Sequence, residues 1–569
     1  MSLPSLRLPV PHAVKQHKPF TRSKQLRRWI ARLPIANNQA AANQLLLQLR
    51  AMNSASYPVK DRFEFLHELQ PLCKQLSGEL RHSLQNAAVP LSRNQLQTLQ
   101  TLQQLLEEQA IAYKLMITEM ALQEDHKKSF AWILQESIYL AIKYLSRQLV
   151  MGYALYQPEA DSIWHELHQL YRFAEGRNLH AESIDDTDPD TPLPLEHTIE
   201  HAYKTIILLR LTEPYHLLET EAESTYQLVA LWANGCEFHR LGTAPPQGEY
   251  IIDQASDLPP RYIPEDMDYQ PQQGILIDIS EAKAQLEKHL AHVLRLNIHE
   301  ASLDGATLVE RRERDMLLRL SDALNARLIR RSKRFLLEGK VQVTLGLNAC
   351  HYHLTNRTDF TPQMDELKLR SESKEKLHSE HALTPFATAY REALEKDRGH
   401  ALQSFSINPW WQRNVSPIGI ALSCTGHCAP RHAKVGQIAA YRLSHKRNVR
   451  WQLGVVRWLR TQPSLEDDGS LELGIMNIAN GAAPVGIKAI HGTGAGTEYY
   501  RGLLIPRHVS LRQSRSIIVP ALIFDINTII AVNMKQRMFY VRLTNMLLST
   551  RDFAQFEFEV RERPPGMLF

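Results

Sequence analysis

The chain has 569 residues, of which 44% are hydrophobic and 22% are charged, and its net charge is +5 with histidine neutral. This length exceeds what a single hydrophobic core usually supports, and the composition is that of an ordinary globular protein, so we expect several soluble domains. The mild positive charge gives no reason to expect nucleic-acid binding, and five cysteines in so long a chain argue against a disulfide-stapled scaffold.

The N-terminal region gives no sign of membrane targeting. Residues 1–20 contain four prolines and no apolar segment of the kind that a signal peptide requires, so we predict a mobile tail there. The best candidate for a membrane span, residues 130–156, is interrupted by charged side chains such as Lys143 and Arg147, which favours a buried amphipathic helix. We therefore expect a cytoplasmic protein with no integral membrane segment.

Residues 21–245 are predicted to form an α-helical domain. Leu96, Leu99, Leu102 and Leu106 show its typical pattern, because apolar residues three and four apart share one face of a helix. Proline-containing breaks separate such stretches, which indicates paired antiparallel helices without a fixed repeat period.

A small α/β connector is predicted for residues 246–306. Its expected strands, at 249–252 and 275–279, are rich in isoleucine and flank a proline-rich connection, and a helix is expected at 281–296. A second strongly periodic helix, at 307–329, follows and leads directly to a cluster of arginines.

The remaining chain is predicted to be mainly β-structure. Residues 307–491 would form a β-barrel and residues 492–569 a β-rich extension, since short strand patterns separated by turn signals dominate both. Residues 352–406 interrupt the barrel, because they are charged and lack strand alternation, and we expect a mobile insertion there. Strands of the barrel are expected at 339–346, 420–423, 437–443, 451–459, 470–479 and 485–490.

Two short motifs stand on either side of this insertion. Arg330 and Arg334 form R-x-x-x-R, and Asn414, Ser416 and Gly419 form N-x-S-x-x-G, which begins 80 positions after Arg334. In this order, and followed by a run of strand patterns, the two motifs resemble the PilZ-domain family, whose small β-barrels bind cyclic di-GMP. The function then depends on whether the two halves meet in the folded chain.

The resemblance implies a role for each motif residue. Arg330 and Arg334 would contact phosphate and guanine, because guanidinium groups make paired, charge-assisted bonds to phosphate oxygens and to guanine O6 and N7. Asn414, Ser416 and Gly419 would contact the second guanine and the strand edge, since short polar side chains can bond a base edge and glycine permits close backbone approach.

The register of the arginine motif stays open at this point. Arg327 and Arg331 have the same spacing three residues earlier, so Arg331 is kept among the expected ligand-binding residues together with Arg330 and Arg334. Only mutation of each pair can decide between the two registers.

The resemblance also implies an architecture and a function. The expected fold class is multidomain α + β, with an all-α N-terminal domain, a small α/β connector, and a PilZ-like antiparallel β-barrel with a further β-rich extension. The expected function is that of a bacterial, non-enzymatic cyclic di-GMP receptor without a cofactor. It would relay the level of this second messenger to an unidentified protein partner through the helical domain.

Two alternatives remain open. One is a ligand-free PilZ-like scaffold protein for assembly, because a fold does not guarantee a site. The other is a zinc-dependent hydrolase, since His197, Glu200 and His201 fit H-x-x-E-H, in which two histidines on one helix face hold Zn²⁺ and the glutamate acts as a base. No pattern specifies a third ligand for that motif, so no metal site is expected.

Overall fold

The structure is a computed structural model, and it describes most of the chain. The residues that it does not describe are 1–3, 9–19, 86, 88, 123–130, 187–196, 219–220, 242–248, 265–270, 272, 296–304, 326–334, 358–359, 361–404, 426–429, 431–432, 445–449, 463–468, 492–498, 508–513, 522, 535–536 and 563–569. Arg330, Arg331 and Arg334 therefore lie outside the described residues.

The chain divides into two compact units, which are described separately below. The first holds residues 1–287, 321–329 and 461–466, and the second holds residues 288–320, 330–460 and 467–569. Chain segments thus pass between the units more than once, and one passage falls directly before Arg330.

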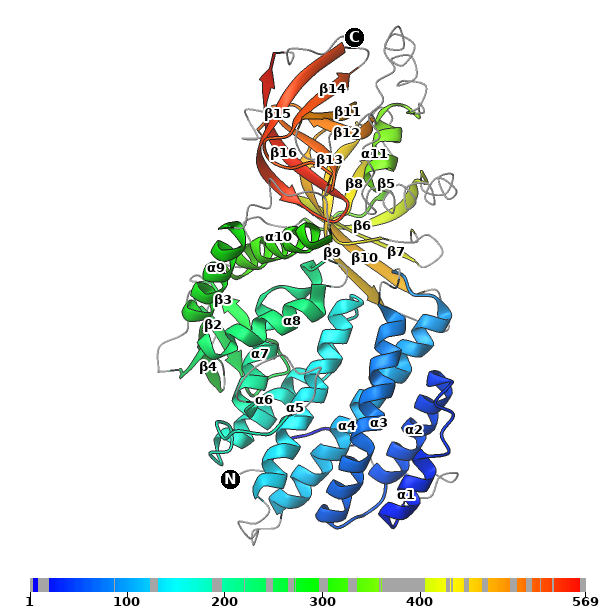
Figure 1. Ribbon diagram of the computed structural model, residues 1–569, viewed down its shortest axis with the longest axis vertical. Coiled ribbons are helices and arrows are strands. Elements are labelled where there is room, and N and C mark those ends of the chain that lie inside the picture. The colour runs from blue at the N-terminus through cyan, green and yellow to red at the C-terminus, as the bar shows by residue number, and fades with distance from the viewer. Residues whose placement is uncertain are drawn as a thin grey trace. The chain divides into compact units, whose positions relative to one another are not determined.

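Most of the first unit is helical, as the leucine spacing predicts (Figure 1). Its helices are α1 Ser23–Ile30, α2 Asn38–Asn53, α3 Val59–Leu84, α4 Arg93–Leu122, α5 Ala131–Ala154, α6 Ile163–Glu175, α7 Ile199–Leu211 and α8 Glu221–Trp232. Helix α5 contacts α4, α6, α7 and α8 and is buried along nearly its whole length, which explains why its sequence is so apolar. Among the described residues, no helix combines the length and apolar character needed to cross a membrane.

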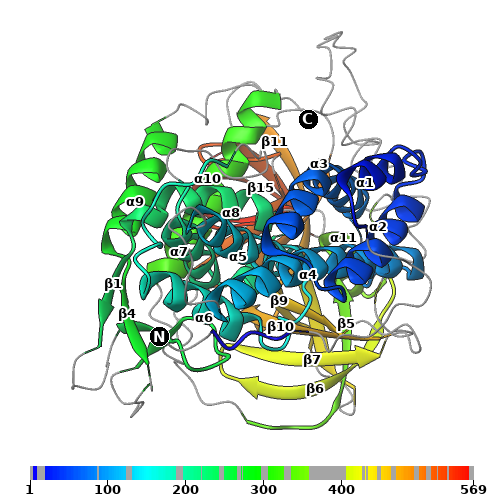
Figure 2. The same ribbon diagram turned by 90° about the horizontal axis from the view of Figure 1, so that it is seen from below.

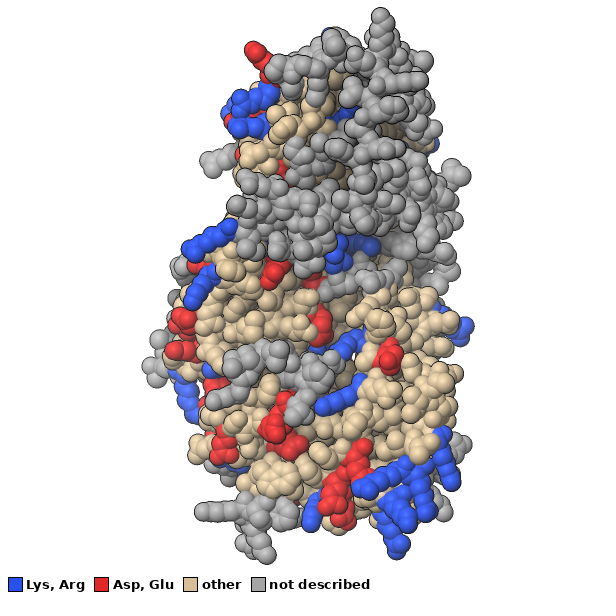
Figure 3. Space-filling model, in the orientation of Figure 1, with Lys and Arg blue, Asp and Glu red and all other residues tan. Residues whose placement is uncertain are grey.

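The short helix α1 has one buried residue, Leu26, and exposes most of its other side chains. Its basic residues Lys24, Arg27 and Arg28 lie on that exposed side, where blue side chains gather in Figure 3. Arg27 forms an exposed ion pair with Glu68 of α3 at 2.7 Å.

The N-terminal tail is not mobile throughout, contrary to the prediction for residues 1–20. Pro4 is buried, and the backbone of Arg7 is held by buried side chains of α4 and α6. Further along, the carbonyl oxygen of Phe20 accepts a hydrogen bond from the Tyr57 hydroxyl at 2.8 Å. Lack of periodicity excludes a helix there, but it does not reveal such tertiary contacts.

A small antiparallel sheet follows the helices, as predicted for the connector. Its strands β1 Glu237–Arg240, β2 Glu249–Asp253, β3 Arg261–Ile263 and β4 Gly274–Asp278 are arranged in the order β1-β4-β2-β3. Helix α9, Ser280–Arg295, comes next, and helix α10, Gly305–Asn325, corresponds to the helix predicted at 307–329.

Two closed antiparallel barrels make up most of the second unit (Figure 1). The first has the strand order β10-β7-β6-β5-β8-β9, with β5 Lys340–Leu345, β6 Asn408–Ser416, β7 Gly419–Thr425, β8 Ile438–Leu443, β9 Gln452–Gln462 and β10 Ser470–Ala479. The second has the order β11-β12-β13-β16-β15-β14, with β11 Ala483–His491, β12 Tyr500–Ile505, β13 Ser516–Pro520, β14 Ile529–Met534, β15 Arg537–Ser549 and β16 Phe553–Arg561.

The predicted fold class is confirmed, but the boundary between the two β regions differs. Strand β11 was expected at 485–490 within the first barrel, yet it pairs with β12 and β14 and belongs to the second. The first barrel ends at Ala479 rather than at 491, and the predicted β-rich extension is a closed barrel. Alternation of apolar residues predicts a strand and its faces, but not the strand with which it pairs.

The two barrels share part of their hydrophobic core. Ile438 and Leu453 of the first barrel belong to the same buried cluster as Ile518 and Phe553 of the second. Helix α11, Leu347–Leu354, contributes Leu347 and Cys350 to this cluster.

The ends of the insertion are also packed against the barrels, which corrects the prediction of a mobile segment over all of residues 352–406. His353 is buried and its Nε2 lies 2.8 Å from the carbonyl oxygen of Phe405, while Tyr352 stacks on the Phe405 ring at 4.6 Å. Phe360 and Phe405 both contact the guanidinium of Arg501 on β12. Residues 361–404 lie outside the described residues.

Candidate functional site

The chain directly after the arginine motif pairs with the strand that holds the second motif. Phe335, the residue that follows Arg334, donates its N–H to the carbonyl oxygen of Val415 at 2.8 Å, and Val415 donates to the carbonyl oxygen of Phe335 at 3.0 Å. Val415 lies between Asn414 and Ser416 on β6. The segment after the arginines thus pairs directly with the strand that holds the second motif.

The described ends of the insertion join this strand pair at the end away from the second motif. Strands β5 and β6 are antiparallel, with Lys340 opposite Trp411 and Val343 opposite Asn408. The chain leaves β5 and returns to β6 at the Asn408 end, whereas Phe335 meets β6 at Val415. Seven residues of extended chain span roughly 20 Å, so the insertion begins and ends far from the motif.

The second motif forms a tight hairpin between β6 and β7, which run side by side in Figure 2. Ser416 is opposite Gly419, and the two residues between them make the turn. The Ser416 hydroxyl donates to the carbonyl oxygen of Gly419 at 3.3 Å. Asn477 on β10 donates its N–H to the Ile418 carbonyl oxygen at 2.9 Å, which fixes the turn from the other side.

The glycine of the motif has a structural cause. A Cβ atom at Gly419 would lie 2.3 Å from the carbonyl oxygen of Ile475 on β10, because β7 and β10 approach closely there. The backbone of the barrel therefore requires glycine at this position, whether or not a ligand is bound.

Strand β6 contains a bulge directly before Asn414. Its register with β7 shifts between Gln412 and Asn414, so Arg413 is the extra residue. The Arg413 Nε donates to the Ser423 hydroxyl at 2.9 Å, and its guanidinium lies 3.9 Å from the carboxylate of Glu472. The Arg413 side chain therefore lies across β7 and β10, on the outer face of the barrel.

Asn477 is held in turn by Tyr441. The Tyr441 hydroxyl, on β8, donates to the side-chain oxygen of Asn477. Burial raises the pKa of Tyr441 to about 12, so the hydroxyl stays a hydrogen-bond donor even at pH values where an exposed tyrosine ionises. The turn between Ser416 and Gly419 is therefore supported across three strands.

Exposed apolar residues flank the paired segment. Phe335, Leu336 and Leu337 are 59%, 87% and 52% exposed, and Ile418 at the hairpin turn is 58% exposed. Sequence reasoning missed these residues, although an apolar run immediately after a basic one was visible. It could not have found Asn477, because nothing in the sequence relates β10 to the hairpin turn.

The competing H-x-x-E-H motif has ordinary structural partners. His201 is buried in α7, with its Nε2 at 2.9 Å from the carbonyl oxygen of Ala230, and burial lowers the pKa of its imidazole. Glu200 forms an ion pair with Lys204 at 2.9 Å, one turn later on the same helix. Within the described part of the chain, no three metal-ligating side chains cluster in a way that could hold an ion.

Comparison with known proteins relates the helical region, the middle region and the second barrel to domains of one receptor. Three family models match: "Cyclic-di-GMP receptor FimW, N-terminal domain" at residues 24–245, "Cyclic-di-GMP receptor FimW, middle PilZ domain" at 250–414, and "FimW C-terminal beta-barrel domain" at 485–561. The third match begins within β11, in agreement with the observed start of the second barrel.

One relative matches this chain over nearly the whole length of both proteins. The cyclic-di-GMP receptor FimW of Pseudomonas aeruginosa PAO1 is 24% identical over an alignment that covers 98% of this chain and 94% of the relative. No solved structure matches the chain. The resemblance to PilZ domains that the split motif indicates is thus confirmed: residues 250–414 match a PilZ-domain model, and the three FimW domain models match one after another along the chain.

Proposed function

We propose that this protein is a non-enzymatic cyclic di-GMP receptor, with its site where the arginine segment meets the β6–β7 hairpin. One observation supports this most strongly. The backbone pairing of Phe335 with Val415 sets the residue next to Arg334 beside Asn414 and Ser416, although 80 positions separate Arg334 from Asn414 in the sequence. The relative that matches nearly the whole chain is named as a receptor for the same ligand.

The residue types suit the chemistry of this ligand. Cyclic di-GMP presents two phosphodiesters and two guanine bases, and Arg330 and Arg334 would supply charge-assisted bonds to phosphate and to guanine O6 and N7. Asn414 and Ser416 are half-buried, so their amide and hydroxyl groups remain within reach of a base edge. The exposed ring of Phe335 offers an apolar face on which a base could stack.

The position of the arginine segment in the chain supports a signalling role. Residues 321–329 belong to the first compact unit and residues 330–460 to the second, so the segment lies at a passage from one unit to the other. A ligand that binds this segment would act on the chain connection between the units. The helical domain would then pass the signal to a protein partner.

Alanine substitution of each arginine tests the site and its register. We expect Arg334→Ala and Arg330→Ala each to weaken cyclic di-GMP binding by about ten- to a hundred-fold, because a charge-assisted hydrogen bond contributes about 1.5–3 kcal/mol. Ser416→Ala should weaken binding less. Isothermal titration calorimetry of the full chain gives these affinities directly.

Two controls separate the possible outcomes. Arg537→Ala changes an exposed arginine on β15 of the second barrel and should leave affinity unchanged. If Arg327→Ala and Arg331→Ala reduce binding while the Arg330 and Arg334 variants do not, the other register is in use. If the wild-type chain releases no heat, the ligand-free scaffold replaces the receptor proposal.

A further inference from the structure

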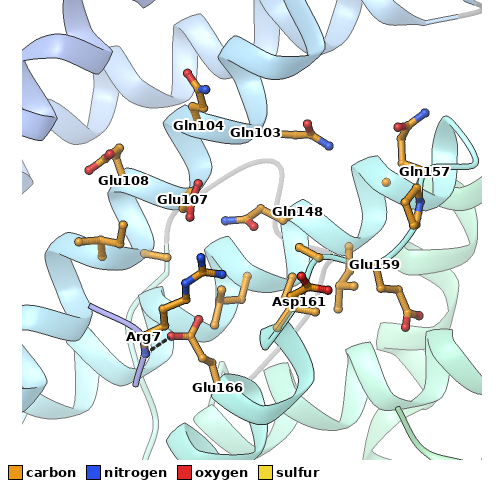
Figure 4. Close-up of a pocket in the computed structure, with 18 of the residues that line it drawn as sticks. Arg7, Gln103, Gln104, Glu107, Glu108, Gln148, Gln157, Glu159, Asp161 and Glu166 are labelled. Carbon is orange, nitrogen blue, oxygen red and sulfur yellow. Dashed lines mark hydrogen bonds between the residues drawn. The ribbon is translucent and has the colours of Figure 1, made fainter. Parts of the chain in front are cut away.

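The helical unit contains a polar cavity that is separate from the nucleotide site. Its volume is about 640 Å³, and it is lined by α4, by the C-terminal half of α5, by residues 157–161 and by α6 (Figure 4). Arg7 and Leu8 of the N-terminal segment line it too. Nothing in the proposed function uses this cavity.

The N-terminal segment is held in the cavity through its main chain. Arg7 donates its N–H to Glu166 Oε1 at 2.7 Å, and its carbonyl oxygen accepts from Lys114 Nζ at 3.1 Å. Lys114 and Glu166 are themselves paired at 2.8 Å. One carboxylate and one ammonium thus bind the donor and the acceptor of a single residue, an arrangement that recognises extended peptide backbone of any sequence.

The ion pair that holds the peptide backbone is deeply buried. The side chains of Lys114 and Glu166 are only 4% and 6% exposed. Burying two charges is costly, and an apolar pair of similar size often stabilises a fold equally well or better. Stability alone therefore gives little reason for this pair, whereas binding a peptide backbone gives a direct one.

The rest of the cavity has groups suited to a longer peptide. Five glutamines line it, at positions 100, 103, 104, 148 and 157, and amide side chains can both donate to and accept from a peptide backbone. The Nε2 of Gln148 is buried and has no hydrogen-bond acceptor among the described residues. This amide points into the space beside Arg7 (Figure 4), where a further backbone carbonyl would satisfy it.

The charge of the cavity indicates the side chain that it prefers. The Arg7 side chain extends into the cavity from the bound segment (Figure 4). Glu107 and Asp161 also line the cavity and form no ion pair within the described part of the chain. By contrast, Glu108 and Glu159 are already engaged, by Arg50 at 3.0 Å and by Arg210 at 3.1 Å.

We propose that this cavity is a docking groove for an extended peptide with a basic side chain, supplied by a partner protein. Residues 4–8 occupy one end of the groove and act as an internal competitor. The partner segment binds through its backbone to Lys114 and Glu166, and its basic side chain lies toward Glu107 and Asp161. The proposal is independent of cyclic di-GMP binding.

A fluorescein-labelled peptide with the sequence of residues 2–8 is the probe, and fluorescence anisotropy with the full chain is the measurement. Arg7→Pro removes the N–H that binds Glu166 and should release the internal segment, whereas Arg7→Ala keeps that N–H. A tethered segment competes at an effective concentration of about a millimolar. The probe should therefore bind the Arg7→Pro chain at least about tenfold more tightly than the wild type, with Arg7→Ala in between.

The groove itself is tested in the Arg7→Pro chain. The double variant Glu107→Gln, Asp161→Asn should bind the probe several-fold more weakly. Its affinity for a probe whose arginine is replaced by alanine should not change. Both residues are exposed, so these changes should not disturb folding. A full chain lacking residues 2–8 replaces Arg7→Pro if that variant does not fold.

The proposal would be overturned if the probe bound equally to the wild-type chain, the Arg7→Pro chain and the chain lacking residues 2–8. The N-terminal segment would then serve only to stabilise the helical unit. Loss of charge at residues 107 and 161 without effect on either probe would overturn the preference for a basic side chain.

Discussion

At the residue scale, the motif glycine is required by the barrel, so its replacement should act on stability. Gly419→Ala places a Cβ atom 2.3 Å from the Ile475 carbonyl oxygen, which is backbone and cannot move aside cheaply. We expect the local free energy of unfolding to fall by roughly 1–3 kcal/mol. Hydrogen exchange of the β7 and β10 amides measures this change.

Gly339→Ala is the matched control for Gly419→Ala. Its Cβ atom would meet only the Gln412 side-chain oxygen, at 4.0 Å, so its effect should stay within about 0.5 kcal/mol. Equal exchange rates in the two variants would contradict the close approach of β7 and β10.

A buried histidine of the helical unit should make stability depend on pH. His168 is fully buried between the Tyr203 hydroxyl, 2.7 Å from its Nδ1, and the Leu258 carbonyl oxygen, 2.9 Å from its Nε2. Burial lowers its pKa from 6.5 to about 4. Between these values the unfolded chain binds the proton and the folded chain does not, so stability falls as pH falls from 6.5 towards 4.

The size of this effect follows from the pKa difference. His168 should contribute a loss of roughly 1.5 kcal/mol between pH 6.5 and 5. Urea denaturation of the wild type and of His168→Gln at both pH values isolates this residue from the other histidines. The variant should lose less stability on acidification, and an equal loss in both proteins would contradict the lowered pKa.

At the scale of elements, the anchored ends of the insertion indicate which part can be removed. Replacing residues 361–404 by a flexible linker of about eight residues should leave the barrels folded, because Phe360 and Phe405 remain packed around Arg501. Thermal unfolding followed by circular dichroism compares the shortened chain with the wild type. Phe405→Ala, which removes the stacking on Tyr352, should lower the melting temperature of either chain.

If the barrels unfold when residues 361–404 are replaced, the prediction is wrong. In that case the segment would contribute to the core. Limited proteolysis of the wild type offers an independent check, since we expect the first cleavage within the same residues.

The elements themselves were largely predictable, whereas their pairing was not. The leucine spacing on α4 and the alternation on β10 are local patterns, and both appear in the structure as predicted. The assignment of β11 to the second barrel and the packing of Phe405 on Tyr352 depend on residues distant in sequence. The pairing of Phe335 with Val415 is of the same kind. The split motif indicated that such a meeting was needed but could not show its geometry.

At the scale of the whole molecule, the contacts of helix α10 bear on any coupling between the two units. Arg314 lies 3.8 Å from the buried carboxylate of Asp525, and Arg319 donates to the Ser549 carbonyl oxygen at 3.2 Å. These contacts hold residues 314–319 to the second barrel. Ligand-dependent change is therefore expected in the chain beyond this part, towards the arginine segment.

Hydrogen exchange with and without cyclic di-GMP tests the coupling. We expect added protection at residues 321–340 and 414–419, with residues 314–319 unchanged, because their contacts do not involve the site. Typical coupling free energies of about 1–3 kcal/mol would slow exchange roughly five- to 150-fold. Protection confined to residues 414–419 would mean that the ligand binds without acting on the chain connection between the two units.

The central claim is that the split motif forms one binding site, and calorimetric titration of the full chain with cyclic di-GMP tests it most directly. We predict saturable heat for the wild type and for Arg537→Ala, and loss of at least about tenfold in affinity for Arg334→Ala. Absence of heat with the wild-type chain, or affinity unchanged in the variants of Arg330, Arg331 and Arg334, would contradict the account.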